Sequence, residues 1–178
     1  RSPNILKVAA NLAATLARKN PSTGVFLCAS EANSVGVAMI DNTGNAEELL
    51  GNSPQTVIVL ENDIDTRFGS ALLDEVKNLV VIDLMDNPTV SRSSIVLPAA
   101  SFAEAEGTFI NNEGRAQRSM ATFKPAGDIA PSYQLLGSLR GDHLPASGWQ
   151  QKLAAEHPSL AGVVTCAPDE QFRIEGSR

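Results

Sequence analysis

Carboxylate, amide, hydroxyl and guanidinium groups gather between Pro98 and Arg118, and this segment is the part of the chain best suited to bind a ligand or a partner. It follows the apolar run 95–97, which is short enough to be a buried strand. In α/β proteins, polar segments that leave the ends of such strands usually carry the ligand or partner contacts. Gly107 and Gly114 permit a positive φ or a close backbone approach. The sequence therefore places its candidate functional site in this segment.

Five side chains carry donor or acceptor atoms that suit the polar parts of a cofactor. They are Asn33, Asp83, Thr108, Asn111 and Glu113. Asn33 and Asp83 each follow an apolar run, so a parallel sheet brings both to its carboxyl edge. The same residue types also bond readily to nearby backbone, in which case Asn33 and Asn87 cap helices. The strand-end loops are acidic and contain no G-x-G-x-x-G or P-loop sequence, which argues against a bound pyrophosphate.

A second set is expected to order the loop and present it to a partner. Its members are Glu104, Gly107, Gly114, Arg115 and Gln117. The planar guanidinium of Arg115 suits a pair with Glu104 or Glu113. If it satisfies buried acceptors, Arg115→Ala is expected to cost roughly 1–3 kcal/mol of stability. We predict no catalytic residue, because no serine has an obvious partner base and neither histidine lies in a triad context.

Composition excludes several classes of function. The net charge is −6, with 14 basic and 20 acidic residues and no basic run, which argues against nucleic-acid binding. No apolar stretch approaches the roughly 20 residues of a membrane-spanning helix. Cys28 and Cys166 form no C-x-x-C pair, so we predict no metal ligand set and two free thiols.

Four continuous apolar runs predict buried strands at 25–28, 56–60, 79–82 and 95–97. Apolar spacing and capping residues predict helices at 4–18, 32–40, 46–50 and 68–77, and further helices that begin near Pro88, Pro131 and Ser147, the last with a Ser147–Gln150 capping box.

Continuous apolar strands are typical of parallel sheets that are buried on both faces. We therefore predict a Rossmann-like open, mainly parallel α/β sheet with helices on both faces over residues 1–140. A helical, loop-rich extension follows at 141–178. Residues 117–123 are expected to form a ribbon or edge strand, and Val163-Val164 is the one hint of a strand in the extension.

The polar segment resembles a known signature. Leu97-Pro98 followed by Glu104-x-x-Gly107-Thr108-x-x-Asn111-x-Glu113-Gly114-Arg115-x-Gln117 is similar to the molybdopterin oxidoreductase superfamily. Asn-x-Glu-Gly-Arg-Ala-Gln at 111–117 is closer to one branch, the large iron–sulfur subunits (G subunits) of bacterial NADH-quinone oxidoreductase, respiratory complex I. Glu31-Ala32-Asn33-Ser34-x-Gly36 resembles another stretch of that branch. The resemblance covers about residues 24–140.

This resemblance implies a fragment of a larger subunit that acts as a scaffold or interaction domain. The implied partners are other domains of that subunit and other complex I subunits, at the cytoplasmic side of the bacterial inner membrane, with no direct membrane span. The fragment is expected to hold no cofactor of its own, with Fe–S clusters, NADH and FMN elsewhere in the complex.

Two alternatives stay open. One is a fragment of a molybdopterin guanine dinucleotide-dependent oxidoreductase, such as a formate dehydrogenase, whose strand-end loops help to hold the pterin. The other is a free-standing nucleotide-binding domain. Ser93-Ser94, and the turn at 41–44, depart from the pattern of catalytic relatives and favour the scaffold.

Overall fold

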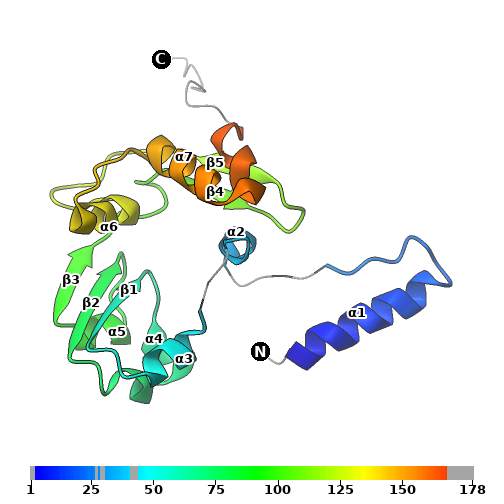
Figure 1. Cartoon of the computed structure of the whole chain (residues 1–178), viewed down its shortest axis with the longest axis horizontal. Helices are drawn as coiled ribbons and strands as arrows, with labels where there is room; N and C mark the ends of the chain where they lie inside the picture. Colours follow the sequence, from blue (N-terminus) through cyan, green and yellow to red (C-terminus); the bar gives the residue numbers. More distant parts are fainter. Residues whose placement is uncertain (1–2, 27, 29–30, 41–43, 168–178) are drawn as a thin grey trace.

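The coordinates are a computed structural model that describes residues 3–26, 28, 31–40 and 44–167. The elements are, in order, α1 (Pro3–Ala17), α2 (Ser34–Ala38), α3 (Ala46–Gly51), β1 (Thr56–Leu60), α4 (Ile64–Phe68), the 3-10 helix η1 (Ser70–Leu73), β2 (Asn78–Asp83), α5 (Pro88–Arg92), β3 (Ile95–Pro98), β4 (Gly107–Ile110), β5 (Ala116–Ser119), α6 (Ser132–Arg140), α7 (Ala146–Glu156) and the 3-10 helix η2 (Pro158–Val164). Figure 1 shows a small sheet with its helices, a hairpin covered by α7, and α1 standing apart from both.

The β1, β2 and β3 strands form a parallel sheet in that order, with β2 in the centre. Val59 of β1 lies opposite Val81 of β2, which lies opposite Val96 of β3. The connections between them run through α4 and η1 and then through α5. The α/β class and the parallel strands at 56–60, 79–82 and 95–97 are thus confirmed.

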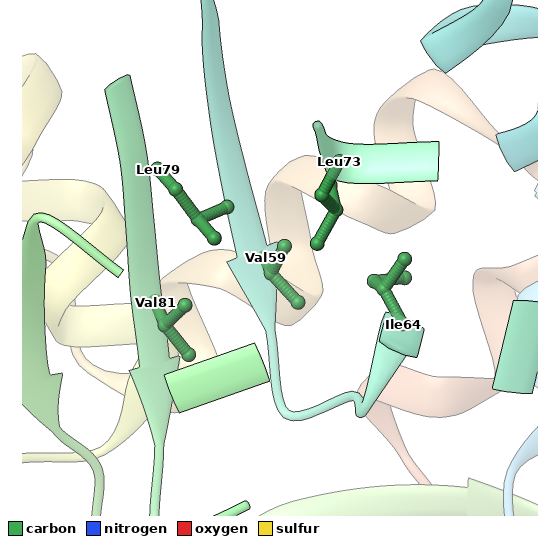
Figure 2. Close-up of a cluster of buried hydrophobic side chains, with 5 residues drawn as sticks. All are labelled: Val59, Ile64, Leu73, Leu79 and Val81. Atoms are coloured by element: carbon green, nitrogen blue, oxygen red, sulfur yellow. The ribbon is translucent and has the colours of Figure 1, made fainter. Parts of the chain in front are cut away.

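One face of this sheet carries the first hydrophobic core, shown in Figure 2. Val59, Leu79 and Val81 lie on this face and pack against Ile64 of α4 and Leu73 of η1. The alternate positions face the other way; there Ile82 is fully buried, whereas Ile58, Leu60 and Ile95 are 48%, 44% and 54% exposed. Among the described residues, the side of the sheet with Val59 and Val81 is therefore the better covered one.

The antiparallel hairpin of β4 and β5 carries the second core. Ile110 packs with Leu160 and Val163 of η2, and Val35 of α2 and Leu153 of α7 lie against this cluster. Residues beyond 141 therefore complete the core under the hairpin. The strand hint at Val163-Val164 is wrong, because these residues end a 3-10 helix.

Two predicted elements near the sheet need correction. Of the helix expected at 68–77, only Phe68, the last residue of α4, and Ser70–Leu73, the 3-10 helix η1, are helical. The α-helix α4 begins earlier, at Ile64, because the Asp63 carboxylate caps it by accepting a hydrogen bond from Thr66 N. It ends at Phe68, since Gly69 has φ +97° and separates α4 from η1.

The predicted strand 25–28 is likewise not a strand at Val25, Phe26 or Cys28, and Leu27 lies outside the described residues. Val25 and Phe26 are 52% and 76% exposed, so the burial that a central strand needs is absent there. Residues 41–43 of the predicted turn also lie outside the described residues.

Other predictions agree with the structure within a residue or a few. The α1, α3 and α6 helices lie where the apolar spacing placed them. Pro88 opens α5, and Asn87 caps it by accepting a hydrogen bond from Val90 N. Strand β5 confirms only the first part of the ribbon expected at 117–123. Cys28 and Cys166 are free thiols, as predicted.

The central strand yields a stability prediction. Val81 is fully buried, so Val81→Ala should lower the free energy of unfolding by roughly 2–3 kcal/mol through lost burial and a residual cavity. Met85→Ala, at a position 66% exposed, is the control and should change it by less than about 0.5 kcal/mol. Urea unfolding followed by circular dichroism measures both, and equal losses would contradict the assigned core.

Candidate functional site

The turn of the hairpin is organised by Asn111. Its side-chain Oδ1 accepts hydrogen bonds from the backbone N of Glu113 at 3.0 Å and of Arg115 at 3.0 Å. The backbone of Asn111 also accepts from Gly114 N, and Gly114 has φ +76°, a conformation that favours glycine. Asn111 and Gly114 therefore hold the turn, and the Asn111 oxygen is used by the chain's own backbone.

Arg115 pairs with Glu113 on the surface of this turn. Its Nη2 lies 3.4 Å from Glu113 Oε2, and both side chains are about 70% exposed. Exposed pairs of this kind contribute about 0–1 kcal/mol. The pairing with Glu113 is as predicted, but no buried acceptor depends on Arg115 in this pair, so the expected cost of 1–3 kcal/mol for its removal does not apply.

A partly buried polar bridge joins the hairpin to α7. Thr108 and Arg118 lie opposite each other on β4 and β5. Gln150 of α7 donates from Nε2 to Thr108 Oγ1 at 2.8 Å and accepts from Arg118 Nη2 at 3.0 Å. Arg118 is only 8% exposed, so a charge-assisted hydrogen bond to an otherwise neutral partner helps to stabilise it.

Sequence reasoning missed this bridge. It used Gln150 in a capping box, but α7 begins at Ala146 after Pro145 and has no side-chain cap. The usable signal was alternation in β5, where Ala116 and Arg118 share the face that is turned inward while Gln117 is exposed. Gly107 pairs with Ser119 at the far end of the hairpin.

Asn33 joins α2 to the same hairpin. Its Oδ1 accepts a hydrogen bond from the backbone N of Ile110 at 2.9 Å. Asn33 occupies the N-cap position of α2 but makes no side-chain capping bond, so the capping interpretation of this residue is wrong. Gly36 is required beside it, because a Cβ there would clash with Asn33 Oδ1.

Asp83 lies at the carboxyl end of β2 and orders the loop that follows. Its Oδ1 accepts from Leu84 N at 2.7 Å and Met85 N at 3.0 Å, and its Oδ2 accepts from Asn87 Nδ2 at 3.0 Å. Both carboxylate oxygens are thus used within the loop, and the residue is 9% exposed.

Glu104 closes the turn between β3 and β4. Its Oε2 accepts from the backbone N of Ser101 at 3.0 Å and from the Ser101 hydroxyl at 2.8 Å. The backbone hydrogen bond and then the hydroxyl lower the pKa of the Glu104 carboxyl from its usual value of 4.5. These hydrogen bonds lie within the turn that contains Glu104. The sequence offers Glu104 as one of two partners for Arg115, and the structure pairs Arg115 with the other, Glu113.

The carboxyl edge of the sheet carries further acidic groups. Asp63 accepts from the hydroxyl of the fully buried Thr89 at 2.8 Å. Hydrogen bonds from Thr66 and Thr89 lower the pKa of Asp63. Glu61, with φ +45°, accepts a hydrogen bond from the Ser132 hydroxyl at the start of α6.

The structure brings only some of the candidate residues together. Asn33, Thr108, Asn111 and Glu113 all belong to the hairpin and the α2 helix beside it, whereas Asp83 ends a strand of the parallel sheet. Within the described ranges, no group of three or more His, Cys, Asp or Glu side chains is placed to hold a metal ion. None of the described helices is long and apolar enough to cross a membrane.

The sequence of the chain matches a known protein family. The molybdopterin oxidoreductase family model matches residues 3–141, well over half of the chain. The chain therefore belongs to the molybdopterin oxidoreductase family, as the spacing of residues 104–117 indicated.

Two similar curated proteins are G subunits of NADH-quinone oxidoreductase from different bacteria. The chain is 34% identical over 194 residues to the G subunit of NADH-quinone oxidoreductase from Pseudomonas fluorescens, covering 98% of this chain and 22% of that protein. The G subunit of the same enzyme from Escherichia coli K12 is 34% identical over 198 residues, which cover 99% of this chain and 22% of the relative. This chain thus spans about a fifth of the length of these relatives. The alignments extend the resemblance beyond residue 140, where the motifs alone had ended.

The partly buried bridge gives a prediction about Gln150. Gln150→Leu removes the acceptor of Arg118 Nη2 and the donor to Thr108, and should cost roughly 1–3 kcal/mol of unfolding free energy. Gln151→Leu, on the exposed side of the same helix, is the matched control and should stay within about 0.5 kcal/mol of wild type. Urea melts of the two variants measure this difference. A wild-type midpoint for Gln150→Leu would show that the bridge does not contribute to the free energy of unfolding.

The lowered pKa of Glu104 predicts a response to acid. Its contribution to stability is present above the unfolded-state pKa and is lost as the pH falls through the lower, folded-state pKa. Glu104→Gln should therefore lose less stability than wild type between about pH 6 and about pH 3 in urea melts. Ser101→Ala, which keeps the backbone donor, should fall between the two. An unchanged pH dependence in Glu104→Gln would remove this assignment.

Proposed function

We propose that this chain is a scaffold and interaction part of the G subunit of an NADH-quinone oxidoreductase, and that it carries out no chemistry itself. The observation that supports the proposal is that the polar side chains of the candidate site make hydrogen bonds within the protein itself. Asn33, Asp83 and Asn111 direct their side-chain oxygens to the chain's own backbone, and Thr108 bonds to Gln150. Side chains engaged in this way position elements of the fold.

The carboxyl edge of the sheet does not fit a pterin dinucleotide. Such a group carries a pyrophosphate, whereas Glu61, Asp63 and Asp83 bring carboxylates to this edge. Two arginines of the helices that follow these strands are engaged in ion pairs, Arg67 with Glu31 and Arg92 with Asp65 and Asp74. The same mismatch weighs against a free-standing nucleotide-binding domain.

A fragment of a molybdopterin guanine dinucleotide-dependent oxidoreductase stays the second candidate. Two observations favour it: the family match itself, and the gathering of strand-end loops at one edge of a parallel sheet, where ligands of such sheets usually bind. In that case other parts of a longer protein supply the groups that hold the pyrophosphate.

In the scaffold proposal, residues 1–140 belong to a Rossmann-like, mainly parallel sheet with helices on both faces. Its partners are other domains of that subunit and neighbouring subunits of the complex. The Fe–S clusters, NADH and FMN are bound elsewhere in the complex, which lies at the cytoplasmic side of the bacterial inner membrane. Two findings support this proposal: the similar proteins are G subunits of NADH-quinone oxidoreductase, and the chain matches the molybdopterin oxidoreductase family.

The test uses the full-length parent protein, tagged and isolated from its own cells. We expect it to migrate on native gels together with a complex that oxidises NADH and reduces quinone. We also expect it to contain far less than one molybdenum or tungsten atom per chain. Gln150→Leu should lower the amount of assembled complex, and Gln151→Leu should not. Stoichiometric molybdenum or tungsten with pterin fluorescence would overturn the scaffold in favour of the second candidate. Migration without the activity would overturn the link to this complex.

A further inference from the structure

The α1 helix exposes an apolar stripe. Ile5, Val8, Leu12 and Leu16 recur at helical spacing on one side and are 69%, 65%, 58% and 46% exposed. Figure 1 shows this helix away from the sheet and the hairpin. Short isolated helices are marginal in water and gain most of their stability when an apolar face is buried. A helix with this pattern is therefore suited to pack on an apolar surface.

The open edge of the sheet offers such a surface. β1 is an edge strand, and a groove of about 480 Å³ runs along it between α3 and α4. We call this the β1 groove; its lining includes Leu49, Val57, Ile58, Leu60, Arg67 and Phe68. Strands of parallel sheets are usually buried, and natural proteins often cover an exposed edge with a helix. The β1 groove is thus an edge that lacks such a cover among the described residues.

The chain that leads from α1 is tied to the rim of this groove. Glu31 Oε1 lies 3.2 Å from Nη1 of Arg67, which lines the groove. Residues 18–30 connect α1 to this point and reach at most about 45 Å when extended. The groove is therefore within reach of the helix.

We propose that α1 docks its apolar stripe into the β1 groove of the same chain and covers the edge of the sheet. The stripe from Ile5 to Leu16 is about 16 Å long at the rise of an α-helix, and the five residues of β1 span about 16 Å. Both surfaces are apolar along this length, with Lys7 on the opposite side of the helix and Arg67 at the groove rim. This inference is independent of the proposed function.

The tether favours this occupant over others. A connection of this length gives α1 an effective concentration near the groove in the millimolar range. The helix of a second copy, or an apolar surface of another protein, must compete with that concentration. The same-chain helix is therefore the expected occupant, and a second copy becomes an outcome of the test.

The test measures how fast a thiol in the groove reacts in the complete chain. Cys28→Ser removes the exposed native thiol, the buried Cys166 is retained, and Ile58→Cys places a reporter in the groove. Leu12→Asp in the stripe should raise the labelling rate of this reporter about tenfold, because it displaces the helix. Ala14→Asp, which adds the same charge on the opposite side of α1, is the matched control and should leave the rate unchanged.

A second measurement tests whether the labelling result arises only because Leu12→Asp unfolds α1 or because Ile58→Cys perturbs the groove. Val8→Ala together with Leu12→Ala keeps good helix formers while it removes apolar area, and should raise hydrogen exchange in β1 of the chain without Ile58→Cys. Equal labelling in Leu12→Asp and Ala14→Asp, or unchanged exchange in the double alanine variant, would overturn the proposal. Protection that appears only with rising protein concentration and a dimeric mass would also overturn it and assign the groove to a second copy.

Discussion

Burial of the central strand β2 is the constraint on which the rest of the parallel sheet depends. Val81 and Ile82 have no exposed surface, and they set the register of β1 on one side and β3 on the other. Once that register is fixed, the carboxyl ends of the strands meet at one edge, and Asp83 orders the loop there through both of its carboxylate oxygens. Loss of packing around β2 therefore disturbs the core and the candidate edge together.

The polar residues of the signature serve the fold in a consistent way. Asn33 ties α2 to β4, Asn111 holds the hairpin turn, and Thr108 connects β4 to α7 through Gln150. Family members that bind a cofactor need polar atoms that face the ligand. In this chain these atoms satisfy donors and acceptors that folding would otherwise leave buried or unpaired. The polar groups of this site therefore act on the protein's own fold.

The molecule also carries apolar surface that its own described contacts do not cover. The stripe of α1 and the groove along β1 match in length and character, and the Glu31–Arg67 pair holds the connecting chain beside the groove. An exposed edge strand such as β1 can pair with other chains, so a tethered helix that covers it would also protect the protein against association through that edge.

The sequence by itself determined the α/β class, three of the strands, the Asn87-Pro88 helix start and the family, because continuous apolar runs, capping residues and motif spacing are local signals. Only the tertiary structure decided where the polar side chains point. Arg118 and Gln150 lie far apart in the chain, and their contact depends on α7 crossing the hairpin. Val25 and Phe26 have strand-like residue types yet stay exposed, since a strand requires a neighbour that supplies hydrogen bonds and burial. Beyond Phe68, the helix predicted at 68–77 is reduced to the 3-10 helix η1, because the Asp63 cap and the positive φ of Gly69 set the ends of the separate helix α4 before it.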